Sequence, residues 1–201
     1  MSAKKYDRDL GIKTTGLREW DNTSLYNRYE ATPYRGMEAL FQSYRLGRTG
    51  RVVDFGCGRG RVVFYIHRRV SGARVGLEGH EKNHNEGIGK KRREKGKTPP
   101  TKDPTPPQKG FTRQEGGKPQ DSCFYFFNPF SSRVFEKVLR NIAASLEKHP
   151  REIDLILYYP LPEYKQAVRK HSFRKINKIR VPGAQDPYGK FVIYRFTPKA
   201  G

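Results

Sequence analysis

The architecture of this protein follows from one segment, Val52-Val53-Asp54-Phe55-Gly56-Cys57-Gly58-Arg59-Gly60. Its first four residues are predicted to form a buried strand, because a short apolar run that ends at a glycine fits a sheet covered on both faces. The glycines let the main chain turn tightly and approach a ligand closely. Beyond Gly60, apolar residues recur at helical spacing at Val63, Ile66 and Val70. The segment therefore predicts a strand, a glycine loop and a helix in succession.

The elements on either side continue the same alternation. A helix is expected to begin near Thr32, with Pro33 in its first turn and an apolar stripe from Met37 to Tyr44. A second buried strand is predicted over residues 73–78. Helix, strand, helix and strand in this order are typical of an α/β protein with a parallel sheet.

The second half of the chain resumes the pattern and then changes it. Buried strands are predicted over 123–127 and 153–159, each followed by a helix, the second of which starts at Pro162. Residues 173–181 and 190–196 alternate in polarity and are joined by turn-forming residues over 183–189. This end of the chain is predicted to form an antiparallel hairpin that closes one edge of the sheet.

Two acidic residues indicate which ligand the glycine loop accepts. Dinucleotides use a Gly-x-Gly-x-x-Gly loop, and here the third glycine, Gly60, comes one residue earlier. Asp54, at the end of the strand, would repel a pyrophosphate but attract the ammonium group of S-adenosylmethionine. Glu78, at the end of the next strand, can accept both ribose hydroxyls of an adenosine. The alternatives are structural: Asp54 can order the loop, and Glu78 can be a solvated strand end.

Composition excludes several classes of protein. The 201 residues include 41 Lys and Arg but 20 Asp and Glu, a net charge of +21, which favours a polyanionic partner such as nucleic acid. No apolar window has the roughly 18 to 20 residues of a membrane span, and no secretory signal is expected at the start of the chain. Two cysteines, Cys57 and Cys123, cannot form a disulfide framework or a four-ligand zinc site, and the histidines show no metal-ligand spacing. We expect a cytoplasmic protein without a membrane partner or a metal; nothing in the sequence indicates an oligomeric state.

On the glycine segment, Glu78 and Phe126-Phe127-Asn128-Pro129-Phe130, the sequence resembles the class I S-adenosylmethionine-dependent methyltransferases. More closely, residues 26–34 and 124–160 look like a group of small bacterial methyltransferases of unknown substrate. The resemblance covers about residues 25–84 and 120–196. It implies a Rossmann-like, mostly parallel sheet of seven strands with one antiparallel strand near its edge. It also implies that S-adenosylmethionine is bound by the loop residues and carboxylates, which are Asp54, Gly56, Gly58, Gly60 and Glu78.

The resemblance implies a catalytic role for Asn128, Pro129 and Phe130. In relatives that methylate amines, a polar side chain and a proline carbonyl at this place accept hydrogen bonds from the target amine, and an aromatic ring stacks on it. Those relatives usually carry two prolines before the aromatic residue, and this chain has one. The structural alternative is that Asn128 caps the next helix, Pro129 occupies its first turn and Phe130 packs in the core.

One segment departs from the expected fold. Residues 85–119 contain ten Lys or Arg, six Pro and six Gly, with only Ile88 and Phe111 clearly apolar. Prolines disfavour helix interiors and sheet ladders, so we expect the third strand and its helix to be missing or disordered within 85–118. A basic insertion or a local shift of the reading frame would explain this composition, and the loss of a strand favours the second. The chain is thus predicted as a polar arm over 1–24 and a domain over 25–201 that this segment interrupts.

Together these patterns predict a methyltransferase that uses S-adenosylmethionine, with RNA or a nucleic-acid-associated substrate favoured by the charge. The alternative is a non-catalytic, basic nucleic-acid-binding protein that keeps the fold without the reaction. An NAD-binding oxidoreductase is disfavoured by the charge of Asp54.

Overall fold

A computed structural model describes residues 2–14, 30–46, 50–69, 74–78, 105–109 and 117–198, with the main chain alone for 74–78 and 105–109. The helices are α1 (Ala3–Asp9), α2 (Tyr34–Ser43), α3 (Arg61–His67), α5 (Ser132–Lys148) and α6 (Pro162–Arg169). The strands are β1 (Arg51–Phe55), β2 (Arg74–Glu78), β3 (Thr105–Lys109), β4 (Asp121–Phe126), β5 (Ile153–Tyr158), β6 (Arg174–Arg180) and β7 (Lys190–Phe196).

The strands form one sheet in the order β3-β2-β1-β4-β5-β7-β6. β3, β2, β1, β4 and β5 pair in parallel, whereas β7 is antiparallel to both β5 and β6. This confirms the predicted α/β architecture and C-terminal hairpin, and it confirms the single antiparallel strand near the edge. The carboxyl ends of β1, β4 and β5 consequently meet at one edge of the sheet, which is where ligands bind in open α/β sheets.

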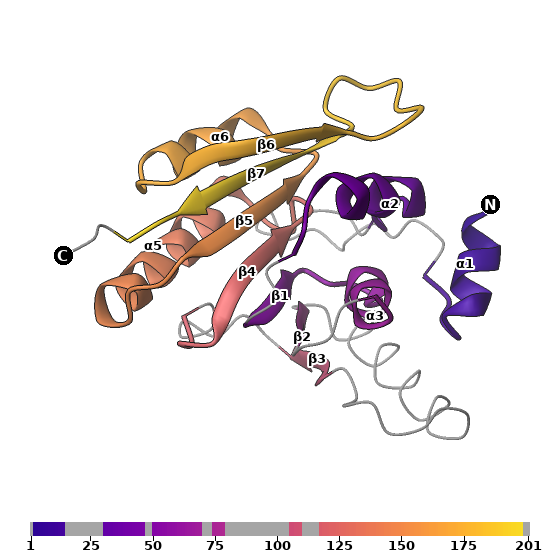
Figure 1. Cartoon of the computed structure of the whole chain (residues 1–201), viewed down its shortest axis with the longest axis horizontal. Coiled ribbons are helices and arrows are strands. Elements are labelled where there is room, and N and C mark those ends of the chain that lie inside the picture. Colours follow the sequence, from indigo (N-terminus) through magenta and orange to yellow (C-terminus); the bar gives the residue numbers. More distant parts are fainter. Residues whose placement is uncertain are drawn as a thin grey trace.

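Helices cover both faces of the sheet (Figure 1). Successive strand residues point to opposite faces, so Val53 and Phe55 pack with α5 and α6 in one core, whereas Val52 packs with α2 and α3 in the other. Both cores are rich in aromatic residues, which explains how a chain with only 34% hydrophobic residues buries two layers. Among the helices of the described ranges, none has the length and apolar character needed to cross a membrane.

The structure corrects the expectation that the third strand is missing. β3 lies inside the proline-rich segment and pairs in parallel with β2 at the edge of the sheet. Its pairing skips register between Thr105 and Gln108, so Pro106 and Pro107 fall within an irregularity of the ladder. An edge strand or a bulge is where proline can be accommodated, because no ladder hydrogen bond has to be donated there. β3 therefore removes the lost strand that favoured a shifted reading frame. The expected loss of the adjoining helix and the expected disorder fall on the remainder of 85–116, which lies outside the described residues.

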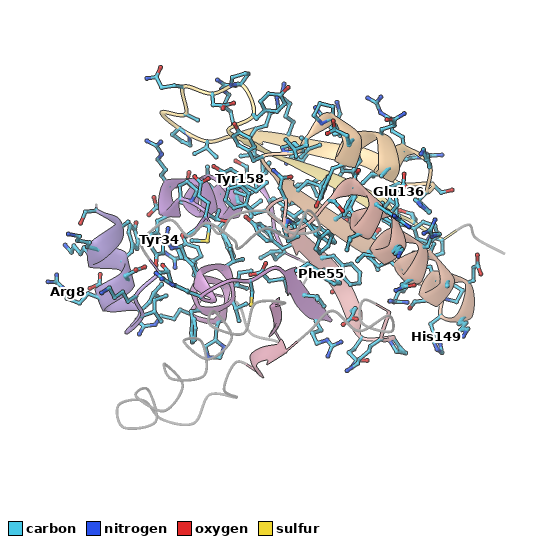
Figure 2. All side chains as sticks on the ribbon, turned by 180° about the vertical axis from the view of Figure 1, so that it is seen from behind. Arg8, Tyr34, Phe55, Glu136, His149 and Tyr158 are labelled. Carbon is cyan, nitrogen blue, oxygen red and sulfur yellow. The ribbon has the colours of Figure 1, made fainter. Side chains whose placement is uncertain are left out.

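The predicted polar arm is also corrected where it is described. Residues 2–14 form α1 and a following turn that pack on the domain, beside α2 and α3 (Figure 1). In Figure 2, Arg8 of α1 and Tyr34 lie on the opposite side of the molecule from Glu136 of α5 and from His149, the residue that follows this helix. The ring of Tyr6 stacks on that of Tyr34 with centroids 4.5 Å apart, and Leu10 is buried. The rest of the arm, 15–24, lies outside the described residues.

A buried polar network holds this N-terminal segment. Asp7 is 4% exposed and accepts hydrogen bonds from the main-chain N–H and hydroxyl of Thr14 and from the hydroxyl of Tyr34. Arg61, the first residue of α3, donates to the Thr14 hydroxyl at 2.5 Å and lies 3.7 Å from the Asp7 carboxylate. The N-terminal segment is thus attached to the helix that follows the glycine loop.

Candidate functional site

The glycine loop lies at the carboxyl end of β1 and leads into α3. Gly56, Gly58 and Gly60 have φ of 71°, 55° and 79°, all in the left-handed region that residues with a Cβ rarely adopt. The N–H of Gly60 donates to the carbonyl of Cys57 at 2.8 Å, which closes the turn immediately before the helix. The sequence pattern at these three positions therefore corresponds to a backbone requirement, as predicted.

Asp54 lies in β1 just before this loop. Its side chain belongs to the face of the sheet covered by α2 and α3, and the residue is only 4% exposed. Its register partner on β4 is Tyr125, whose hydroxyl hydrogen-bonds that of Thr32 at 2.7 Å. Burial raises the pKa of Tyr125 well above its ordinary value, and the charge of Asp54 raises it further. The neighbouring phenol is therefore neutral, and the side chain of Asp54 lies in a largely dry setting.

Glu78 is the last residue of β2, at the same edge of the sheet. Phe55 of β1 is paired with Leu77, so Glu78 stands one position beyond it, level with the start of the glycine loop. On its other side it is paired with Lys109 of β3. The topology thus brings Glu78 and the glycine loop to adjacent strand ends.

The segment after β4 contacts the glycine loop directly. A Cβ built on Gly56 would lie 2.3 Å from the Cβ of Pro129, much closer than two carbon atoms can approach. Gly56 is therefore required twice, by its positive φ and by the proximity of Pro129. The glycine loop, predicted to bind the cofactor, is therefore in van der Waals contact with the segment after β4, predicted to bind the acceptor.

The side chain of Asn128 bridges two strand ends. Its Nδ2 donates to the main-chain carbonyl of Tyr159, the residue directly after β5, at 2.7 Å. Both residues have left-handed φ, 42° for Asn128 and 52° for Tyr159, and this conformation is unfavourable for a tyrosine. Strained backbone of this kind concentrates at functional sites.

Phe130 occupies a different position from the one that a ring-stacking role requires. It is fully buried and packs edge-on against Phe55 and Phe126, with centroids 6.3 and 6.4 Å apart. Its carbonyl accepts a hydrogen bond from the Tyr164 hydroxyl at 2.6 Å. Phe130 is therefore a core residue behind the site, as in the alternative interpretation that it packs in the core.

Tyr159 is the residue that the sequence did not single out. It is half-buried, and its ring lies within 6.4 Å, centroid to centroid, of Phe127. Its position after a buried strand that ends at the ligand-binding edge was a usable signal. The cysteines carry no comparable indication, since Cys57 and Cys123 are both buried. Within the part of the chain that the structure describes, no group of three or more His, Cys, Asp or Glu residues could hold a metal ion.

Comparison with known proteins supports the fold alone. No protein-family model and no curated protein matches the sequence. A TehB-like S-adenosylmethionine-dependent methyltransferase from Corynebacterium glutamicum matches with a TM-score of 0.52 and 13% identity, over 83% of this chain and 88% of its own. The methyltransferase in a complex with the Trm112 activator from Haloferax volcanii gives 0.56 and 12%, over 82% and 90%. Magnesium protoporphyrin IX methyltransferase from Synechocystis, crystallised with bound S-adenosylmethionine, gives 0.52 and 13%, over 79% and 74%.

All three structural neighbours are described as methyltransferases, one as S-adenosylmethionine-dependent and another with S-adenosylmethionine bound. The seven-stranded sheet with its antiparallel β7 agrees with the sheet that the sequence resemblance implied. The chain therefore has the class I S-adenosylmethionine-dependent methyltransferase fold.

Proposed function

We propose that this protein is a methyltransferase that takes its methyl group from S-adenosylmethionine and that RNA, or a substrate associated with nucleic acid, accepts it. The observation that carries the proposal is the buried carboxylate of Asp54 followed by three glycines in left-handed conformation. A fold shared with methyltransferases is insufficient by itself, because one fold hosts many functions.

The loop residues fit this cofactor by their chemistry. Asp54 offers a negative charge to the ammonium group of the methionine moiety, and this charge disfavours the pyrophosphate of a dinucleotide. Glu78, at the adjacent strand end, accepts hydrogen bonds from the ribose hydroxyls. Gly56, Gly58 and Gly60 let the main chain approach the cofactor closely.

The cofactor, when bound, supplies an activated methyl group on a sulfonium, so the protein mainly has to align the acceptor and exclude water. We assign acceptor alignment to Asn128 and to the carbonyl of Pro129, because both follow β4 beside the glycine loop. We give Tyr159 the aromatic role in place of Phe130, because the Tyr159 carbonyl accepts the Asn128 amide whereas Phe130 is in the core. As the carbon–nitrogen bond to an acceptor amine formed, the carbon–sulfur bond of the methyl group would break, and the amine would then lose a proton to solvent.

The net charge of +21 supports the acceptor class, because a nucleic acid gains affinity when basic side chains replace its counterions. The same charge also suits a non-catalytic binding protein of this fold. The Asn128 amide nitrogen already donates to the Tyr159 carbonyl, so in the proposed reaction the side-chain oxygen of Asn128 would accept the hydrogen bond from the acceptor amine.

Two measurements test the proposal. Thermal unfolding with S-adenosylmethionine, its demethylated product or NAD should show a raised midpoint with the first two only. Incubation with cofactor labelled in the methyl group should then transfer label to cellular RNA, and ribonuclease should release that label. Label that survives ribonuclease but not protease would identify a protein acceptor, and cofactor binding without any transfer would support the non-catalytic alternative.

A further inference from the structure

A cluster of basic side chains lies outside the glycine loop, on the side of the sheet where the parallel strands have their carboxyl ends. Lys178 and Arg180 are exposed and lie two residues apart on β6, with buried Ile179 between them. Lys190 begins β7, and Lys165 lies in the first half of α6. We call Lys165, Lys178, Arg180 and Lys190 the edge cluster.

Like charges face one another within the edge cluster. Arg180 and Lys190 are register partners on the antiparallel strands β6 and β7. Like charges placed directly opposite in a sheet are destabilising. Partial burial lowers the pKa of Lys190, the charges of Lys178, Lys165 and Arg180 lower it further, and the carboxylate of Asp186 opposes them. An anionic ligand would relieve this repulsion.

The nearby acceptors neutralise the edge cluster only in part. Lys190 Nζ donates to the carbonyl of Pro187 at 2.7 Å, and Arg180 donates to the carbonyls of Pro187 and Ala184 at 3.5 and 3.4 Å. These carbonyls are uncharged. The carboxylate of Asp186 accepts hydrogen bonds from the hydroxyl of Tyr159 and the N–H of Tyr188, and its charge offsets part of the charge of Arg180 and Lys190.

Aromatic rings connect the edge cluster to the candidate acceptor site. The Nζ atoms of Lys165 and Lys190 lie 5.8 and 5.7 Å from the ring centroid of Tyr188. The Tyr188 ring lies 5.6 Å from that of Tyr159, whose carbonyl accepts the Asn128 amide. Cations and half-buried aromatic rings thus lead in a continuous series from β6 to the end of β4.

We infer that the edge cluster, with Tyr188, binds single-stranded nucleic acid and directs it toward Asn128. Cationic grooves combined with aromatic rings are the means by which proteins hold single strands, the cations contacting phosphates and the rings stacking on bases. A base inside a duplex is inaccessible to an enzyme that modifies it, whereas a single strand presents its bases directly. The direction toward Asn128 rests on the proposed function; binding by the edge cluster does not.

The test compares two variants that each remove one lysine and one arginine charge. Lys178→Gln/Arg180→Gln alters the edge cluster, and Lys137→Gln/Arg140→Gln alters exposed positions on α5. Fluorescence anisotropy measures the affinity of labelled 12-nucleotide single-stranded RNA, single-stranded DNA and duplex RNA between about 50 and 200 mM salt. Calorimetry with S-adenosylmethionine, run on every variant, reports the cofactor site separately.

We expect the edge variant to bind single strands about tenfold more weakly than wild type, with a log–log salt slope about 1.4 shallower for two lost phosphate contacts. The α5 variant should stay near wild type. Tyr188→Leu should weaken single-strand binding about fivefold or more, and Tyr188→Phe should preserve it. RNA bound in preference to DNA, or the reverse, identifies the kind of strand, and either result supports the inference.

Equal losses in the edge and α5 variants would overturn the inference, because they would show that the charge acts diffusely. Failure of wild type to bind any single strand at low salt, or a preference for duplex, would overturn it as well. If the edge variant fails to bind single strands while every variant retains cofactor affinity, the inference holds independently of catalysis. Single-strand binding in a protein that takes up no cofactor would leave the inference standing and overturn the proposed function.

Discussion

Gly56 and Pro129 are in such close contact that a methyl group on Gly56 would lie 2.3 Å from the Pro129 Cβ. The two residues follow neighbouring parallel strands, β1 and β4. One belongs to the loop proposed to bind the cofactor and the other to the segment proposed to align the acceptor. Packing of interior atoms transmits small displacements, so a change in one segment should be felt in the other.

Gly56→Ala should lower both the free energy of unfolding and the affinity for S-adenosylmethionine. The left-handed φ alone costs about 1–2 kcal/mol for a residue with a Cβ, and the overlap with Pro129 adds to it. Urea denaturation and calorimetry measure the two effects. Gly183→Ala is the matched control, because Gly183 has a similar φ of 70° but its Cβ would meet only the end of the Arg35 side chain, at 3.0 Å. Equal stability losses in the two variants would contradict the packing argument.

Phe130→Ala should reduce the free energy of unfolding by about 3–5 kcal/mol. The Phe130 ring is fully buried in the core that also contains Phe55, Phe126 and Phe135. Phe127→Ala, three residues earlier, should cost less because Phe127 is only half-buried. Chemical denaturation measures both. A small loss for Phe130→Ala, accompanied by failure to bind an acceptor, would show that the residue belongs to the acceptor site after all.

Glu78→Ala should weaken S-adenosylmethionine binding by about 1–3 kcal/mol, the range for losing a partner of buried hydroxyls. Arg74→Ala is the control, because Arg74 is the first residue of β2 and lies at the opposite end of this strand from Glu78. Titration calorimetry distinguishes the two variants. If Glu78→Ala binds as wild type does, Glu78 is a solvated strand end.

Attachment of the N-terminal segment should weaken at acidic pH. Burial by itself raises the pKa of Asp7, but hydrogen bonds from Tyr34 and Thr14 outweigh it and hold the pKa below the ordinary value of 3.8. A lowered folded-state pKa stabilises the attachment above pH 3.8, and the stabilisation is lost as the pH falls toward the lower value.

Hydrogen exchange of α1 amides, corrected for the intrinsic effect of pH, should therefore show falling protection below about pH 4. Asp7→Asn should reduce protection at neutral pH and remove most of the acid dependence. Asp9→Asn, an exposed position on the same helix, should behave like wild type. Acid-independent protection of α1 in wild type would contradict the role given to Asp7.

Local sequence patterns were sufficient for the parts of the fold that rest on periodicity. β1, the glycine loop and the C-terminal hairpin could be predicted because each has a hydrophobic period or a turn signal of its own. β3 could not, because Pro106 and Pro107 argue against a strand unless its place at a sheet edge is already known.

Tertiary contacts explain the other differences. The attachment of the N-terminal segment depends on contacts with residues far along the chain, namely the Tyr6–Tyr34 stack and the contacts of Asp7 with Tyr34 and Arg61. The glycine pattern was recognisable because the loop imposes its backbone requirements locally, whereas the ligand role given to Asp54 stays a prediction. Whether Phe130 points into the core or toward a ligand depends on the packing of α6, which the sequence around Asn128 does not reveal.

The central claim, that the loop after β1 binds S-adenosylmethionine through Asp54, is tested most directly by calorimetry on Asp54→Asn. The substitution preserves the shape of the side chain but removes its charge. We expect the affinity to fall about 10- to 100-fold, as for the loss of a charge-assisted hydrogen bond. Asp121→Asn is the control. Asp121 is the first residue of β4, at the end of the strand away from the glycine loop, and its carboxylate pairs with Arg51, so the substitution should lower stability but not affinity. Equal affinity in wild type and Asp54→Asn, or no binding by wild type, would contradict the account.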